Sequence, residues 1–251
     1  MVEDSASLID FYDRAYLMEG AQAAVYARWR SLGAVGKAEH VIALCEGAEM
    51  TPRSTLDVGC GDGALLGELR RRGFGGRLEG AEISESALAI ATARADVDAV
   101  TLFDGEKLPF GTAEFDLGVI SHVLEHVPDP ARLLGEVARV CGAVVFEVPL
   151  EANLSARRAG KSEHAMEIGH LHRLDRGAAR AIATGAGLRV GGELEDALPL
   201  EVQRFFARSG FQRALATGKW AARASAHRLA PALARRMFTV HYACLCLQRE
   251  L

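Results

Sequence analysis

The sequence lacks a hydrophobic run long enough to cross a membrane. Although 49% of its 251 residues are hydrophobic, it has no stretch of about 18 apolar residues, the length that a membrane-spanning helix needs. The first residues, Met1 to Asp4, include two acids and lack the basic and then apolar order of a secretory signal. We therefore expect a cytoplasmic protein without a membrane span.

Cysteine is scarce, and its spacing fits no disulfide or metal framework. An odd number of cysteines without paired C-x-x-C units indicates reduced thiols. Cys244 and Cys246 lie two apart in an expected strand and so share one face, where core packing is a better interpretation than metal binding. The five cysteines are Cys45, Cys60, Cys141, Cys244 and Cys246.

Acidic residues are absent from one segment of an otherwise acidic chain. Residues 203–236 contain eight Lys or Arg and no Asp or Glu, although the chain has a net charge of −4. Aromatic residues interleave with these cations at roughly helical spacing within 198–236, which Pro231 divides. The pattern predicts a basic helical lid or partner surface, with a solvated helical face as the alternative. A single basic segment is unlike the broad basic face of a nucleic-acid enzyme, so no nucleic-acid partner is expected.

The stretch LDVGCGDG, from Leu56 to Gly63, predicts a tight turn between a strand and a helix. Glycines at alternate positions allow positive φ angles and let a ligand lie directly on the backbone, and the following helix start offers unpaired N–H groups. These features indicate a nucleotide site. However, Gly59-x-Gly61-x-x-Ala64 also fits a loose dinucleotide fingerprint.

Asp57 helps to separate these possibilities. A carboxylate at the end of the first strand would repel a pyrophosphate on the turn but would attract an ammonium group. A ligand that joins a nucleoside to an amino acid fits better. The stretch resembles motif I of the class I S-adenosylmethionine (SAM) dependent methyltransferases.

Two further blocks carry the same resemblance. Glu82 ends an expected second strand, and Asp104 follows an expected third strand. The sequences LPF (108–110) and FDLGVIS (115–121), at this spacing, are similar to the methyltransferase pattern. The resemblance implies SAM as the cofactor, with Glu82 accepting the ribose hydroxyls and Asp104 the adenine amino group. The cofactor-binding residues that it assigns are Asp57, Gly59, Cys60, Gly61, Gly63, Glu82, Ile83, Asp104, Gly105 and Ser121.

The expected fold is a Rossmann-like α/β domain with a seven-stranded, mainly parallel sheet and helices on both faces. An N-terminal helical cap (1–50) precedes the methyltransferase domain (51–251), whose helical insertion (198–236) comes before the last strand. We expect Gly20, Gly33 and Gly36 to interrupt the cap helices and Pro149 to end the fifth strand. In the cap, Tyr12, Tyr16 and Tyr26 are candidates for covering a ligand, although packing on the sheet edge is an equal alternative.

The residues that follow the fourth expected strand should meet the acceptor. His122 and His126 offer imidazoles that can deprotonate a hydroxyl near neutral pH, which favours O-methylation of a small molecule. The group that the stretch resembles is the ubiquinone and natural-product methyltransferases. A nitrogen or carbon acceptor, an acidic or carrier-bound acceptor, and a packing role for His126 stay open.

The resemblance also raises the question of a metal ion. Ubiquinone-pathway O-methyltransferases can use an acid at the position of His122, together with a Glu-His pair, to hold a divalent cation. Here the pair is Glu125-His126, and histidine replaces the acid, which does not suit magnesium. We therefore predict a mechanism without a metal. His164, His170 and His172 lie in an expected mobile loop over 151–173.

Two functions of other classes remain possible. One is a SAM-binding scaffold without catalysis, against which the joint presence of Asp57, Glu82 and Asp104 argues. The other is a dinucleotide-binding oxidoreductase, against which Asp57 argues. The oligomeric state is not predicted.

Overall fold

The computed structural model describes residues 13–249, except 15, 18, 19, 159, 161, 162, 164, 166 and 198. Tyr12 and His164, which the sequence offers as candidates, lie outside the described residues. Within the described part of the chain, no helix is both long enough and apolar enough to cross a membrane.

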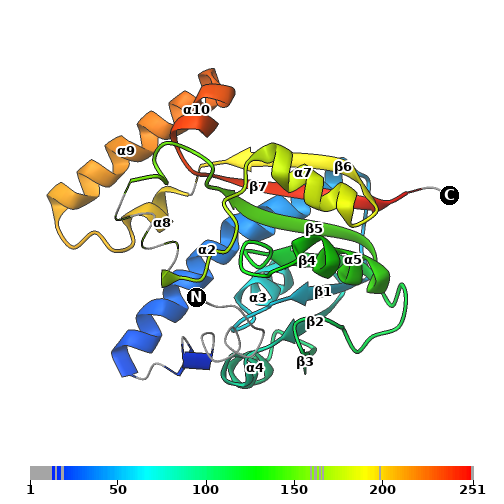
Figure 1. Cartoon of the computed structure of the whole chain (residues 1–251). Helices are drawn as coiled ribbons and strands as arrows, with labels where there is room; N and C mark the ends of the chain where they lie inside the picture. Colours follow the sequence, from blue (N-terminus) through cyan, green and yellow to red (C-terminus); the bar gives the residue numbers. More distant parts are fainter. Residues whose placement is uncertain are drawn as a thin grey trace.

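Seven strands form one sheet in the order β3-β2-β1-β4-β5-β7-β6 (Figure 1). Neighbours from β3 to β5 pair in parallel, and β7 is antiparallel to both β5 and β6. The predicted seven-stranded, mainly parallel sheet is confirmed. The strands are β1 (Ser54–Val58), β2 (Arg77–Glu82), β3 (Ala99–Leu102), β4 (Phe115–Ser121), β5 (Cys141–Leu150), β6 (Leu188–Asp196) and β7 (Val240–Gln248).

Helices cover both faces of the sheet, as predicted (Figure 1). On one face, α2, α3 and α4 contribute apolar side chains to a core that also contains Leu78 and Val119 of the sheet. On the other face, α5 and α7 do the same around Phe146. Strand order reverses between β1 and β4, and ligands of such sheets bind outside the strand carboxyl ends at this point. These helices are α2 (Gly20–Gly47), α3 (Ala64–Arg71), α4 (Glu85–Thr92), α5 (Pro130–Val140) and α7 (Arg176–Gly185).

The predicted interruptions at Gly33 and Gly36 are wrong, because α2 is continuous through both glycines. A glycine inside a helix costs about 1 kcal/mol relative to alanine, but packing against the sheet offsets this cost. Gly36 is buried, and a Cβ at its position would lie 3.3 Å from the Pro199 side chain. Glycine at 36 therefore lets the segment after β6 approach the helix.

The predicted strand end at Pro149 is also wrong, because β5 continues to Leu150. Strand β4 ends at Ser121, opposite Glu147, so Pro149 has no β4 partner. On the other side, Pro149 pairs with His241 of β7. Proline is tolerated in a strand where its missing N–H removes no ladder hydrogen bond.

The predicted helical insertion is present as three helices, α8 (Leu200–Arg204), α9 (Gly210–Leu229) and α10 (Pro231–Met237). Proline at the first position of α10 divides the last two, as expected. The α9 helix has no buried residue and extends away from the body of the protein (Figure 1). By contrast, α8 packs against α2, and the Phe206 ring just after it lies 6.4 Å from that of Trp29.

All five cysteines are free and buried. The Sγ atoms of Cys244 and Cys246 lie 3.7 Å apart inside β7. The predicted packing role of this pair fits their position in the core on the α5 and α7 side of the sheet.

Candidate active site

A cavity of about 660 Å³ opens at the carboxyl ends of β1, β2, β4 and β5, beneath α2 and the start of α8. Its volume lies within the range of about 300–1,000 Å³ that is typical of small-ligand sites. His122 and His126 line it, as do nine of the ten predicted cofactor residues. Those nine are Asp57, Gly59, Cys60, Gly61, Glu82, Ile83, Asp104, Gly105 and Ser121.

Gly63 is the exception, since it does not line the cavity. It precedes α3 as the N-cap residue, with a φ of 73°. Its role is to turn the chain into the helix. The ligand-facing glycines are Gly59 and Gly61, whose φ angles are 73° and 56°. A Cβ at Gly59 would lie 2.5 Å from Cγ2 of Val123, so only glycine fits there without displacement.

Glu82 fixes the glycine turn from the end of the neighbouring strand. Its Oε2 accepts a hydrogen bond from the Gly61 N–H at 2.7 Å, and Oε1 accepts from the N–H groups of Ile83 and Ser84 at 2.9 and 3.0 Å. Burial raises the pKa of Glu82, although these three donors act in the opposite direction. A carboxylate offers about four lone-pair sites. Glu82 can therefore accept about one more hydrogen bond, fewer than the two ribose bonds predicted for it.

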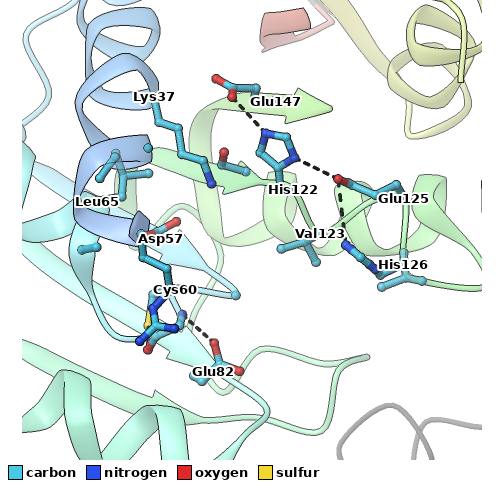
Figure 2. A pocket seen from close by; sticks show the side chains of 18 of the residues that line it. Lys37, Asp57, Cys60, Leu65, Glu82, His122, Val123, Glu125, His126 and Glu147 are labelled. Atoms are coloured by element: carbon cyan, nitrogen blue, oxygen red, sulfur yellow. Dashed lines mark hydrogen bonds and ion pairs between the residues drawn. The ribbon is translucent and has the colours of Figure 1, made fainter. Parts of the chain in front are cut away.

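Asp57 lies at the end of β1 with only 3% of its surface exposed. Burial raises its pKa to about 7, while the nearby Lys37 lowers it. Figure 2 shows Lys37 reaching from α2 into the space between Asp57 and His122. The cavity wall thus carries an acid and a cation at one place, which suits the zwitterionic part of an amino acid.

Sequence reasoning missed Lys37, although a signal was available. Lys37 lies at helical spacing beside Ala34, Ala38 and Val41, all of which are buried. A lone lysine at helical spacing within an apolar stripe is unusual, because burying an unpaired ammonium is costly. Such a lysine points to a site that an anion can enter.

The far end of the cavity holds the residues predicted to bind adenine. Oδ1 of Asp104 accepts hydrogen bonds from the N–H groups of Glu106 and Lys107 at 2.8 and 2.7 Å. These bonds lower the pKa of Asp104 and keep it ionised. Tyr16 lines the cavity beside Gly61, whereas the Tyr26 ring lies 6.3 Å from that of Phe206 and is absent from the cavity wall.

We call the part of the cavity around His122, Glu125 and Glu147 the acceptor end, because the acceptor is expected there. His122 adopts a φ of 58°, a conformation that is uncommon for residues other than glycine. This turn directs the imidazole between two buried carboxylates (Figure 2). Nδ1 lies 3.1 Å from Oε1 of Glu125, and Nε2 lies 3.2 Å from Oε1 of Glu147. Burial and Lys37 lower the pKa of His122, but the two carboxylates outweigh them and raise it.

Glu147 is the centre of the acceptor end, and sequence reasoning missed it. Besides His122, its carboxylate lies 2.8 Å from Nδ1 of His40 and 3.2 Å from Nδ1 of His241. Burial would raise the pKa of Glu147, but these three histidines lower it well below its usual value. His40 also lies 3.2 Å from Asp196. Burial acts against the charged form of His40, but the two acids raise its pKa to about 10.

Glu125 lies between the two candidate catalytic histidines, because its Oε1 is 3.1 Å from Nδ1 of His122 and 4.0 Å from Nε2 of His126. His126 also approaches His170, and its Nδ1 lies 3.1 Å from the carbonyl oxygen of Gly169. Burial lowers the pKa of His126 and favours its neutral form. Within the described residues, two sets of side chains place ligand atoms close enough to hold a metal ion. They are His122, Glu147 and His241, and Glu125, His126 and His170.

Comparison with known proteins favours a methyltransferase over a dinucleotide-binding oxidoreductase. Residues 56–143 match a family model described as a methyltransferase domain. These residues thus form part of a methyltransferase domain. The match runs from within β1 to the start of β5, and it includes the glycine turn and the carboxyl ends of β1, β2 and β4. It supports the predicted cofactor, SAM, over a dinucleotide.

Curated relatives of this methyltransferase domain carry related names. The chain is 34% identical over 115 residues to a ubiquinone biosynthesis O-methyltransferase of Thiobacillus denitrificans, covering 42% of this chain and 48% of that protein. It is 31% identical over 147 residues to a protein of the same name from Sodalis glossinidius, covering 53% and 58%. The chain thus spans about half the length of the curated relatives it matches.

Solved structures share the fold of the methyltransferase domain. Magnesium protoporphyrin IX methyltransferase from Synechocystis, solved with S-adenosylhomocysteine, matches with a TM-score of 0.60 and 13% identity, covering 98% of this chain and 100% of that one. Phosphoethanolamine N-methyltransferase 2 from Haemonchus contortus matches with a TM-score of 0.65 and 16% identity, covering 96% of this chain and 60% of that one. At these identities the likeness concerns the fold, and the predicted Rossmann-like methyltransferase fold is confirmed.

Proposed function

We propose that this protein transfers the methyl group of SAM to a hydroxyl group of a small molecule. The observation that carries the proposal is that Asp57 and Lys37 line the cavity together at the reversal point of the sheet. Their opposite charges suit the ammonium and carboxylate of the methionine part of SAM. Glu82 and Asp104 follow along the same wall for the ribose and the adenine.

The sulfonium of SAM makes its methyl group electrophilic, so the protein mainly has to align an acceptor and help to remove its proton. The group placed for that second task is His122, which lies next to the cofactor half of the cavity and is held by Glu125 and Glu147. His126 is the second predicted catalytic residue and lines the same end. Two imidazoles beside two carboxylates favour an acceptor that must lose a proton, and the names of the relatives favour oxygen.

The cofactor is tested by thermal unfolding with SAM, S-adenosylhomocysteine or NAD⁺. We expect the first two to raise the unfolding temperature, because a ligand that binds only the folded state stabilises it, and NAD⁺ to leave it unchanged. Mass spectrometry of a panel of hydroxylated small molecules, incubated with SAM and enzyme, then reports methyl transfer. Stabilisation by NAD⁺ alone would contradict the proposal.

The affinity for SAM should depend on pH through Asp57. Burial raises its pKa to about 7, so below pH 7 the carboxyl is protonated and loses its attraction for the SAM ammonium. We expect the dissociation constant to rise by up to about tenfold per pH unit below 7 and to level off above it. Calorimetry between pH 5.5 and 8.5 measures this change.

Asp57→Asn is the matched control, because it keeps the shape of the side chain and removes the titration. Its SAM affinity should be weak and flat over the same pH range. The raised pKa of Asp57 also affects the stability of the fold. In contrast to SAM binding, which weakens at low pH, this contribution to stability is greatest at low pH. Because the folded-state pKa lies above the unfolded value of about 3.9, the contribution of Asp57 to stability is present at low pH and is lost as pH rises through 7. An equally steep pH profile in Asp57→Asn would assign the effect to another group.

The basic segment should matter for an acidic acceptor. Arg204 and Arg208 are exposed at and just beyond the end of α8, a helix whose Val202 lines the cavity. Reversing both to Glu should raise the Michaelis constant for a carboxylate- or phosphate-bearing acceptor, more so at low salt, and leave SAM binding unchanged.

Arg213 and Arg228, which are exposed on α9, provide the control for this reversal. Their reversal makes the same change in charge away from the cavity, since neither residue lines it. For a small acceptor, only the α8 variant should respond. If both double variants respond, the acceptor extends along α9, as a carrier-bound substrate would. No response of either variant to salt would make the segment structural.

A further inference from the structure

Three side chains of the kinds that bind metal ions meet at the acceptor end of the cavity. One ligand atom each from His122, Glu147 and His241 lie within 4.8 Å of one another, and Oε1 of Glu147 is 3.2 Å from both Nε2 of His122 and Nδ1 of His241. They come from three strands that are adjacent in the sheet. His122 directly follows β4, Glu147 pairs with the last residue of β4, and His241 lies on β7, which pairs with β5. A set built on paired strands is held more rigidly than one on loops.

The distances in this set leave room for an ion between the three side chains. Both imidazole nitrogens lie 3.2 Å from the same oxygen of Glu147, whereas hydrogen bonds between histidine and a carboxylate are usually about 2.7–2.9 Å long. Ligands that surround Zn²⁺ tetrahedrally at about 2.0–2.1 Å are separated from one another by roughly 3.3 Å. The other oxygen of Glu147 shows the contrast, since it lies 2.8 Å from His40, a normal hydrogen-bond length.

The surroundings orient two of the three ligands. Nδ1 of His122 is directed at Glu125, so its Nε2 faces Glu147. Glu147 is in turn held by His40, which is held by Asp196. Metal-binding histidines usually direct their second nitrogen to a carboxylate or a carbonyl, and ligating carboxylates are themselves hydrogen-bonded. Glu125, Glu147 and Asp196 supply negative charge around the set, against the cations His40 and Lys37.

The backbone at His122 gives a second, independent indication. Its φ of 58° costs roughly 1–2 kcal/mol for a residue with a Cβ. Residues held in such conformations cluster at ligand sites and active sites, where the surrounding structure enforces them. Here the conformation brings the His122 ring to a centroid distance of 4.7 Å from His241. The strained residue is therefore the one that completes the set.

We propose that His122, Glu147 and His241 bind one divalent transition-metal ion, of the Zn²⁺, Fe²⁺ or Mn²⁺ class. Two imidazoles and one carboxylate match the donor preferences of these ions and not those of Mg²⁺, which prefers oxygen. Three protein ligands leave a position open towards the cavity. On the proposed function, on which this further step rests, a hydroxyl oxygen of the acceptor occupies that position and becomes acidic enough to lose its proton to water, so that His122 then acts as a ligand and not as the base.

The second set, Glu125, His126 and His170, is the other place where a metal ion could bind, so the experiment must distinguish the two sets. Protein stripped with a chelator is titrated with ZnCl₂ by calorimetry, and CoCl₂ is added separately to record the visible spectrum of the bound ion. We expect one equivalent to bind. Loss of a residue that only holds a metal ligand in place typically weakens metal binding by about 10–100-fold. Glu147→Gln and His241→Ala remove a ligand itself, so they should weaken Zn²⁺ binding by more than this. Asp196→Asn should weaken it by about tenfold.

Two matched histidine variants complete the test. His170→Ala removes a ligand from the competing set, and His227→Ala removes a histidine outside the cavity. Both should bind Zn²⁺ as the unmodified protein does. Loss of binding in His170→Ala but not in His241→Ala would overturn the proposal, as would the absence of stoichiometric binding by the unmodified protein.

SAM binding, measured by calorimetry on the same samples, separates this proposal from the proposed function. It reports whether Glu147→Gln and His241→Ala are folded, because the cofactor residues lie elsewhere in the cavity. Intact SAM binding without Zn²⁺ binding would remove the ion and leave the methyltransferase proposal standing. Zn²⁺ binding without SAM binding would remove the methyltransferase proposal and leave the metal site standing.

Discussion

Gly59→Ala should weaken SAM binding by about a hundredfold relative to the unmodified protein. The new Cβ would lie 2.5 Å from Cγ2 of Val123, a stiff β-branched side chain, at a φ of 73°. The turn must move, and its N–H groups then no longer face the cofactor. Losing two such hydrogen bonds costs about 3 kcal/mol, or about a hundredfold in the dissociation constant. Calorimetry with SAM measures the loss.

Gly73→Ala is the matched control for this substitution. Gly73 has a similar φ of 67°, but nothing lies within 4 Å of a Cβ placed there. Both variants should lose roughly 1–2 kcal/mol of stability from the backbone alone, and only Gly59→Ala should bind SAM more weakly. Equal SAM affinities in the two variants would show that the cofactor does not lie on the glycine turn.

His122→Ala should lower the turnover number by about 10²–10⁴ at saturating SAM, with SAM affinity unchanged. This is the range that a positioned acid or base contributes, and loss of a ligand to an activating ion would act on the same step. The imidazole lies at the acceptor end, between Glu125 and Glu147. Steady-state kinetics and calorimetry on the same preparation separate turnover from cofactor binding.

His122→Gly separates the side chain from the backbone. It removes the same imidazole but suits the φ of 58°. It should therefore be as inactive as His122→Ala, yet more stable by roughly 1 kcal/mol. Recovery of activity in the glycine variant would mean that backbone geometry, and not the imidazole, limits turnover. Full activity in both variants would mean that the imidazole of His122 does not contribute to catalysis and that the protein acts by aligning the two substrates.

The cofactor half of the site was predictable because its residues are local in the sequence. Asp57, Glu82 and Asp104 each stand at or just after the carboxyl end of a strand, and in a doubly wound sheet those ends share one edge. Sequence pattern therefore located them without knowledge of strand pairing. Gly63 differs from these residues for a local reason, since the third glycine of the motif is the N-cap residue of α3.

The acceptor half was not predictable in the same way. Glu147 is a single acid within an apolar strand, and His241 meets it only through the antiparallel register of β7 on β5. A shift of that register by one residue would turn His241 to the other face of the sheet. His40 and Lys37 come from α2, whose continuity through two glycines depends on packing and not on propensity. Tertiary contacts between distant segments decide all four positions.

The place of β7 in the sheet also bears on how the protein matures during translation. β7 is synthesised after the six other strands, yet it is inserted between β5 and β6. Chains fold largely from the N-terminal side as they are made, so the segments that carry Asp57, Glu82 and Ser121 are available well before His241. We expect a nascent chain to acquire its cofactor half first and its acceptor half only once β7 closes the gap. The acceptor end is therefore complete only after β7 has paired with β5 and β6.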